Sequence, residues 1–162
     1  MIHRAKAGRS LFAALVTALV ALLAPAAGAQ GLFGSGVPTI TLEEIHAAEE
    51  NGETLQFVDV RSEEEMAVSM IPGAITRREY ERNPKAYEDA RIVPYCTVGA
   101  RSGKYTRELR DRGVAAVNYR GSILDWVEAG EPLVTREGEP TKRVHTYSKR
   151  FTVPEPYVQV TE

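Results

Sequence analysis

Cysteine is nearly absent from this sequence, because Cys96 is the only one among 162 residues. A lone cysteine cannot form a disulfide within the chain, and it cannot supply a thiolate-rich metal site. The sequence also lacks a continuous apolar stretch of about 20 residues, the length that a membrane-spanning helix needs. Its longest such stretch, residues 11–24, has 14 residues and is apolar apart from Thr17. These absences exclude an intrachain disulfide and a thiolate metal centre, and they argue against a multi-pass membrane protein.

Acidic residues are missing from the first 42 positions, where three basic residues precede the apolar stretch. Small residues follow it, and residues 27–29 read Ala-Gly-Ala, which fits an A-x-A cleavage site. A basic start, a short apolar middle and a small-residue exit are typical of a secretory signal peptide. We predict that residues 1–29 form such a peptide, cleaved near Ala29-Gln30, and that the protein is periplasmic or secreted. The alternative is that the segment is retained as an anchor.

An excess of basic charge is also missing, because the chain has 20 Lys and Arg against 22 Asp and Glu, a net charge of −2. Loss of residues 1–29 would remove three basic residues and no acidic ones, which leaves a net charge of −5. Nucleic-acid binding normally needs a basic surface, so we predict no nucleic-acid partner and no membrane partner after cleavage. In an oxidising compartment Cys96 would have no cysteine partner, which marks it as reactive unless it is a small buried core residue.

The composition that remains, 43% hydrophobic and 26% charged, is typical of a globular protein, and the length suits one domain. After a glycine-rich, flexible lead-in at residues 30–37, short apolar segments alternate with helical ones. Thr41 with Glu44 and Ser62 with Glu65 have the spacing of capping boxes, which mark helix starts. Strands are predicted at 55–60, 91–95 and 114–119, and helices after Thr41 and Ser62, at 102–112, at 122–129 and in part of 78–88, with a break at Pro84. This alternation predicts an α/β fold in which helices cover both faces of a parallel sheet.

The chemistry of the sequence is concentrated in residues 96–102, Cys-Thr-Val-Gly-Ala-Arg-Ser, between a predicted strand and a predicted helix. Backbone N–H groups of such a loop can converge on the sulfur, and the helix N-terminus adds positive potential, so both favour the thiolate. Gly99 allows a tight turn, and Arg101 places a fixed positive charge beside an anionic site. We predict that Cys96 is a nucleophile, the alternative being a structural cysteine. No histidine is close in sequence, so a Cys–His pair has no support.

Residues 96–102 resemble the active-site loop C-x-x-G-x-R-S of the rhodanese family of sulfurtransferases. Further segments are similar to the family pattern and follow in the expected order: Asp59-Val60-Arg61, Glu65-Met66, Ile71-Pro72-Gly73-Ala74 and the run from Gly121 to Trp126. The similarity covers residues 38–133, which we interpret as one rhodanese-like domain. Residues 134–162 then form a C-terminal extension.

The resemblance implies a doubly wound parallel sheet and a persulfide mechanism that needs no cofactor and no metal. Cys96 would take a sulfane sulfur from a small anionic donor such as thiosulfate and pass it to cyanide or a thiol, with a protein acceptor as a further option. Arg101 would attract and orient the donor, while Asp59 and Arg61 would brace the loop. The residues expected to form the substrate-binding loop after the nucleophile are Thr97, Val98, Gly99, Ala100, Arg101 and Ser102.

Three features depart from the family pattern. Ser69 and Met70 replace a Gly-His pair before the turn at residues 71–74, and because that histidine is not a catalytic base we expect activity to survive. Pro94 lies in the predicted central strand, where its missing N–H predicts a local irregularity. Residues 134–162 lie outside the usual domain, and we expect a hairpin or an extended strap that covers an edge, binds a partner or dimerises.

Two other functions fit part of this pattern. Phosphatases and arsenate reductases of the same fold place one residue more between the Cys and the Arg than the four found here, 97–100. A persulfide carrier or protein-binding module is the second alternative, although a purely non-catalytic module would not need Cys96. The function that the sequence favours is an exported sulfurtransferase. The physiological donor and acceptor are left open.

Overall fold

A computed structural model describes residues 36–161 of the chain. The predicted signal peptide, its cleavage point and most of the predicted lead-in lie outside the described residues. Within residues 36–161, no helix combines the length and the apolar character that crossing a membrane requires.

The centre of the domain is a parallel sheet with the strand order β1-β5-β4-β2-β3. β1 pairs with β5, and β2 pairs with both β3 and β4. A single parallel bridge between Ile92 and Ala116 joins β4 to the residues just before β5. The strands are β1 (Thr39–Ile40), β2 (Leu55–Asp59), β3 (Ile75–Thr76), β4 (Arg91–Tyr95) and β5 (Asn118–Tyr119). Because the strands are parallel, their carboxyl ends meet at one edge, where ligand sites of such sheets lie.

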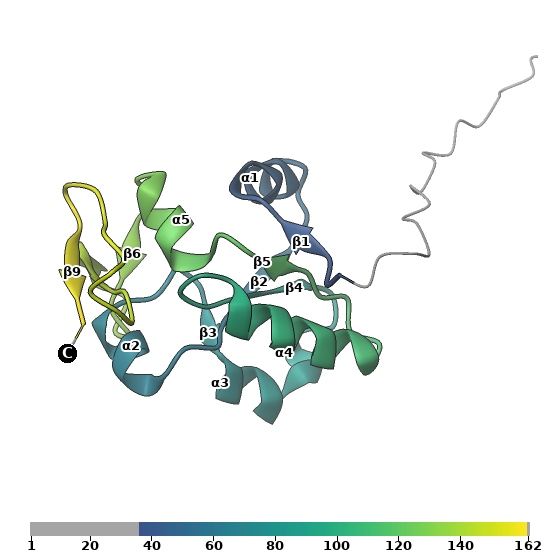
Figure 1. Ribbon diagram of the computed structural model, residues 1–162. Coiled ribbons are helices and arrows are strands. Elements are labelled where there is room, and N and C mark those ends of the chain that lie inside the picture. The colour runs from purple at the N-terminus through teal and green to yellow at the C-terminus, as the bar shows by residue number, and fades with distance from the viewer. Residues whose placement is uncertain (1–35, 162) are drawn as a thin grey trace, which may run out of the picture. The chain divides into compact units, whose positions relative to one another are not determined.

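Helices cover both faces of this sheet (Figure 1). On one face are α1 and α5, and on the other are α3 and α4. The helices are α1 (Leu42–Glu50), α2 (Glu63–Val68), α3 (Arg77–Arg82), α4 (Ala100–Asp111) and α5 (Ser122–Glu128), with one 3-10 turn at Pro84–Tyr87. The predicted α/β fold, a doubly wound parallel sheet with helices on both faces, is confirmed.

Alternating strand residues build two separate cores, one under each helical layer. Phe57 and Val93 face the core beneath α1 and α5, which also holds Trp126. Their neighbours Val58 and Ile92 face the opposite core, beneath α3 and α4. This period of two, with both faces apolar, is what a sheet buried on both sides requires.

Both predicted capping boxes are present. The Thr41 hydroxyl accepts the Glu44 N–H at the start of α1, and the Ser62 hydroxyl accepts the Glu65 N–H at the start of α2. A third box with the same spacing begins α3, where Thr76 and Glu79 cap one another. The predicted break at Pro84 is also found, because a 3-10 turn begins there.

Two boundaries differ from the sequence-based expectation by more than one residue. The strand predicted at 114–119 is regular only at Asn118–Tyr119, and α4 begins at Ala100 rather than residue 102. β4 runs unbroken through Pro94, so the irregularity expected within this strand is not found. Pro94 affects only the pairing of β4 on its other side: the N–H of Ile92 points toward β5, and Pro94, two residues on, has no N–H for the next bond there. Pairing with the chain before β5 therefore stops at the Ile92 bridge.

The C-terminal extension packs onto the domain in two parts. β6 (Leu133–Val134) and β7 (Pro140–Thr141) form the antiparallel hairpin that was one of the expected forms, and Val134 bridges to Met70. Residues 143–160, here called the strap, begin with β8 (Arg143–His145) and end with β9 (Val158–Val160), which pair in parallel. β8 lies against α2, and Val144 and Tyr157 are buried in the core beneath α1 and α5.

Candidate active site

Cys96 lies at the carboxyl end of the central strand β4, and a short loop leads from it into α4. The residue is 1% exposed. Gly99, the residue before the helix, has φ +85°, in the left-handed region that favours glycine. A Cβ atom at this position would also collide with the carbonyl oxygen of Arg120. The loop can therefore turn this tightly over β5 only with glycine at position 99.

Hydrogen-bond donors surround the sulfur atom of Cys96. The Gly99 N–H lies 3.1 Å from Sγ, and the Ser102 hydroxyl lies 3.6 Å from it. Burial raises the pKa of the Cys96 thiol, but hydrogen bonds from Ser102, Val98 and Gly99 outweigh burial and hold this pKa below its ordinary value. Since the thiolate is the nucleophilic form of cysteine, this environment favours attack on an electrophile.

Ser122 fixes the backbone of Cys96, and the sequence did not single it out. Its hydroxyl donates to the Tyr119 carbonyl at 2.9 Å and accepts the Cys96 N–H at 3.1 Å. Ser122 also has φ +57°, unusual for a residue other than glycine. The only sequence signal was its place in the segment from Gly121 to Trp126.

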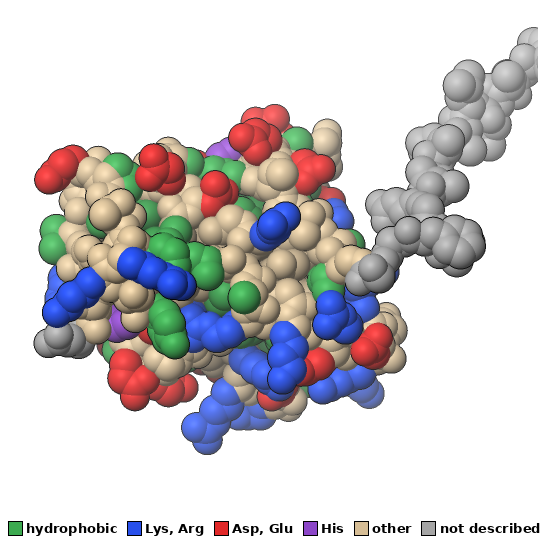
Figure 2. Space-filling view, in the orientation of Figure 1, with side chains coloured by type: hydrophobic (Ala, Val, Ile, Leu, Met, Phe, Trp, Pro, Cys, Tyr) green, Lys and Arg blue, Asp and Glu red, His purple; other side chains and the backbone are tan. Residues whose placement is uncertain are grey.

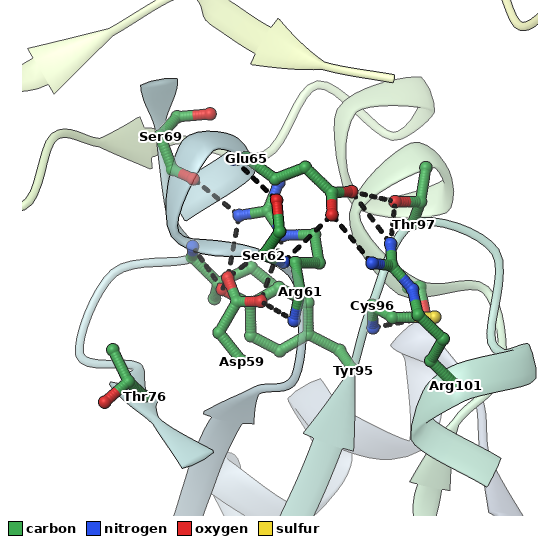
Figure 3. A network of polar contacts seen from close by, with 12 residues as sticks. Asp59, Arg61, Ser62, Glu65, Ser69, Thr76, Tyr95, Cys96, Thr97 and Arg101 are labelled. Atoms are coloured by element: carbon green, nitrogen blue, oxygen red, sulfur yellow. Dashed lines mark hydrogen bonds and ion pairs between the residues drawn. The ribbon is translucent and has the colours of Figure 1, made fainter. Parts of the chain in front are cut away.

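Glu65 is the second residue that the sequence did not assign to the site. Its carboxylate receives two hydrogen bonds from the Arg101 guanidinium, at 2.7 and 2.8 Å, and one from the Thr97 hydroxyl at 2.8 Å (Figure 3). The Glu65 carboxylate accepts the Ser62 N–H as well, so the side chain that completes the capping box of α2 also ties that helix to the Cys96 loop. Burial raises the pKa of Glu65, but these bonds, above all those from Arg101, lower it to about 2.

This ion pair changes the interpretation of Arg101. The guanidinium lies beside the loop and its side chain is 40% exposed, yet its charge is balanced by a carboxylate that is 3% exposed. The hydrogen bonds to Glu65 raise the pKa of Arg101 above its ordinary value. Arg101 therefore holds the loop in place, and its predicted role in attracting an anionic donor stays a prediction.

Asp59 and Arg61 lie outside the Cys96 pocket, in a buried cluster at the end of β2 (Figure 3). The Arg61 guanidinium donates to Asp59 at 2.7 Å and to the Ser69 carbonyl, while the Tyr95 hydroxyl donates to Asp59 and accepts the Ile71 N–H at 3.1 Å. The cluster joins the ends of β2 and β4 to the turn at residues 69–71. The placement of Asp59 and Arg61 agrees with the bracing role, which stays a prediction.

A cavity of about 220 Å³ opens over Cys96. Two parts of the chain line it: the loop after β4, with Cys96, Thr97, Val98, Ala100 and Arg101, and the strap, with Tyr147, Arg150 and Phe151. Gly99 and Ser102 complete the loop behind the sulfur. A larger hollow of about 660 Å³ lies between α1 and α5 and shares Val98, but no cysteine or histidine lines it.

The strap was not assigned to the site by the sequence. Its only signal was an aromatic and basic run, Tyr147 to Phe151, in a segment without a recognised motif. Within residues 36–161, no group of three or more His, Cys, Asp and Glu side chains is arranged to hold a metal ion. What the arrangement offers chemically is a stabilised thiolate at the base of a small pocket that has hydrogen-bond donors and positive charge around it.

Comparison with known proteins gives a consistent picture. The rhodanese-like domain family matches residues 41–129. The human thiosulfate:glutathione sulfurtransferase is 31% identical over 112 residues, which cover 58% of this chain and 96% of the human protein. A sulfurtransferase of Allochromatium vinosum is 36% identical over 90 residues, which cover 53% of this chain and 84% of that protein. The crystal structure of a rhodanese-like domain protein from Staphylococcus aureus superposes with a TM-score of 0.51 at 28% identity, over 61% of this chain and 98% of that one.

Proposed function

The chain belongs to the rhodanese-like domain family, and we propose that it is a sulfurtransferase that carries a sulfane sulfur on Cys96. The observation that carries the proposal is that the Gly99 N–H and the Ser102 hydroxyl point at Sγ of Cys96, which lines a cavity together with Arg101 and Arg150. The two relatives at 31% and 36% identity are both sulfurtransferases, which supports the same chemistry.

The proposed reaction has two displacement steps. The Cys96 thiolate attacks the outer sulfur of thiosulfate, a new S–S bond forms to Sγ, the S–S bond of thiosulfate breaks, and sulfite leaves with the electron pair. An acceptor thiolate or cyanide then attacks the outer sulfur of the Cys96 persulfide and returns the Cys96 thiolate. Charge and electrons balance without any further oxidant or reductant. A thiol acceptor is supported by the human relative, whose name includes glutathione.

The loop geometry suits a persulfide better than a phosphoryl group. Between Cys96 and Arg101 stand four residues, one fewer than in the related phosphatases. The Arg101 guanidinium binds Glu65 at two points and so is not free to close over the oxygens of a phosphoryl group. A persulfide needs fewer hydrogen-bond donors than a phosphoryl group. It extends Sγ by one sulfur atom, and backbone N–H groups can stabilise its single anionic end.

The experiment that tests the proposal is the mass of the intact protein after incubation with thiosulfate. We expect a gain of one sulfur atom at Cys96, which cyanide or dithiothreitol removes. Turnover should be measured with thiosulfate and 3-mercaptopyruvate side by side, since the two donors distinguish sulfurtransferase classes. The matched control is Cys96→Ser, which nearly conserves volume and should fold while it neither gains sulfur nor turns over. Hydrolysis of aryl phosphates that depends on Cys96, without a sulfur adduct, would instead establish a phosphatase.

We also propose that the protein is exported to the periplasm or secreted, on the strength of the sequence pattern in residues 1–29. Cellular fractionation followed by N-terminal sequencing tests this proposal. We expect the mature chain to begin at or near Gln30. Soluble cytoplasmic protein that still carries Met1 would contradict it.

A further inference from the structure

The C-terminal strap lies outside the residues that match the family, 41–129, yet it forms one wall of the Cys96 cavity. We infer that the strap is a specificity element of this site and that Arg150 is the residue that recognises the negative charge of a small anionic donor. The inference deepens the proposed sulfurtransferase function and, as regards the donor, rests on it. Three observations carry it: the placement of the strap, its rigid attachment and the distribution of charge around the cavity.

The placement is direct, because Tyr147, Arg150 and Phe151 line the cavity opposite the loop that carries Cys96. The Arg101 guanidinium carbon lies 5.5 Å from the centre of the Tyr147 ring, so the strap and the loop touch at the rim. Figure 2 shows hydrophobic side chains between the C-terminal strands and the start of α4, with Lys and Arg side chains around them. The strap thus narrows the approach to the nucleophile.

The strap is attached at several points along its length. The Gln159 side-chain amide donates to the Thr146 hydroxyl at 2.8 Å, to the Ser148 carbonyl at 3.3 Å and to the Phe151 carbonyl. Pairing of β8 with β9 and the burial of Val144 fix both ends of this loop. Tyr147 is held at φ +64°, a left-handed conformation that a tyrosine keeps only where its surroundings impose it.

The charges around the cavity single out Arg150. The Arg101 charge is balanced by Glu65, as described above. Arg150 forms no ion pair with any carboxylate in residues 36–161, and its guanidinium carbon lies 4.8 Å from the centre of the Phe151 ring. A guanidinium that stacks on an aromatic ring keeps its N–H groups available for an anion at the ring's edge. Arg150 therefore supplies the uncompensated positive charge of this pocket.

The test compares two reagents that alkylate Cys96, the only thiol of the chain. Iodoacetate is anionic and iodoacetamide is neutral, and both attack the same sulfur, so the ratio of their rate constants measures the electrostatic preference of the pocket. The variants are Arg150→Ala and Arg150→Lys. The matched control is Arg143→Ala, which removes the same charge from an exposed position of the strap that does not line the cavity.

We expect Arg150→Ala to lower the iodoacetate-to-iodoacetamide ratio by roughly three- to five-fold at low salt, the range for one exposed charge interaction. Added salt should shrink this difference because it screens the charge. The ratio in Arg150→Lys should stay close to the wild-type value, and the ratio in Arg143→Ala should equal it. In Arg150→Ala, KM for thiosulfate should rise by a factor similar to the fall in the ratio. An unchanged ratio in Arg150→Ala, or an equal fall in Arg143→Ala, would overturn the inference.

The alkylation test does not depend on sulfur transfer, so the two proposals can fail separately. A wild-type protein that takes no sulfur from thiosulfate but shows the Arg150-dependent ratio would contradict the proposed function and support the anion-recognising strap. If the protein forms the persulfide but its iodoacetate-to-iodoacetamide ratio is the same in Arg150→Ala, the proposed function would be supported and the role of Arg150 contradicted.

Discussion

Glu65 and Arg101 form an ion pair with two hydrogen bonds, of 2.7 and 2.8 Å, between α2 and the first turn of α4. The carboxylate is buried and the guanidinium is partly exposed, so the pair forms one side of the loop that follows Cys96. Burial of a carboxylate is unfavourable unless hydrogen bonds compensate for it, and here they come from Ser62 and Thr97 as well. The pair makes the position of the loop dependent on the position of α2.

The first prediction concerns stability. Glu65→Gln should lower the free energy of unfolding at pH 7 by about 2 kcal/mol, because it removes charged hydrogen bonds at a buried site. The pKa of Glu65 is lowered from 4.5 to about 2, so its ionised form stabilises the fold fully above pH 4.5 and ceases to do so as the pH falls toward 2. Urea unfolding of wild type and Glu65→Gln across this pH range should therefore show a difference that shrinks below pH 4.5.

A control for that measurement is Glu63→Gln, on the same helix. Glu63 pairs with Arg136 at 2.7 Å, but its side chain is 60% exposed, so loss of its charge should matter much less. Equal losses in the two variants would show that the Glu65 pair contributes no more than a surface ion pair.

The second prediction separates the charge of Arg101 from its pairing. Arg101→Ala removes a positive charge near Cys96 and leaves the buried Glu65 carboxylate unpaired, and both changes should raise the pKa of Cys96. In the double variant Arg101→Ala with Glu65→Gln, part of that rise should disappear. The pH dependence of iodoacetamide alkylation measures the pKa, and KM for thiosulfate should rise in the single variant.

The result would be read as a double-mutant cycle. If Arg101→Ala alone has normal alkylation and normal kinetics, then Arg101 acts on neither the thiolate nor the donor. If the single and double variants raise the pKa of Cys96 equally, the charge of Glu65 has no effect on that pKa, and Glu65 only holds the loop in place.

The third prediction concerns Ser102, whose hydroxyl lies 3.6 Å from the sulfur. Loss of this donor in Ser102→Ala should raise the pKa of Cys96, since it removes one of the interactions that lower it. Alkylation at neutral pH should then slow by about three-fold, the value of one modest hydrogen bond. The rate at high pH, where all of the thiol is ionised, should match wild type, and a matching profile at every pH would refute the role of Ser102.

The fourth prediction compares two glycines in the same backbone conformation. Gly99 has φ +85° and Gly113 has φ +82°, but only at Gly99 would a Cβ atom meet the backbone of Arg120. Gly113→Ala should cost about 1 kcal/mol of stability, the strain of a left-handed alanine, and Gly99→Ala clearly more. Thermal and urea unfolding of the two variants would show this, and equal costs would mean that the loop can move away from β5.

Local sequence patterns predicted much of the fold. The capping boxes at Thr41 and Ser62 identified helix starts because their hydrogen bonds join residues three apart. The same spacing between Thr76 and Glu79 begins α3, a helix start that is not among those predicted from the sequence. The extent of β5 could not be predicted in this way, because it is set by pairing with β1, whose residues Thr39 and Ile40 lie far earlier in the chain.

Short-range patterns predicted the loop after Cys96: Cys96 follows an apolar strand, Gly99 allows the turn, and a helix follows whose N-terminus lies next to the sulfur, although it begins at Ala100 rather than residue 102. These features are short-range, because they depend on backbone conformation and on residues a few positions apart. Which residues surround that loop depends on long-range packing. Glu65 lies 36 positions before Arg101, and Arg150 lies 54 positions after Cys96. Such side chains meet because buried apolar faces pack α2 and the strap against the domain, and no local pattern encodes that packing.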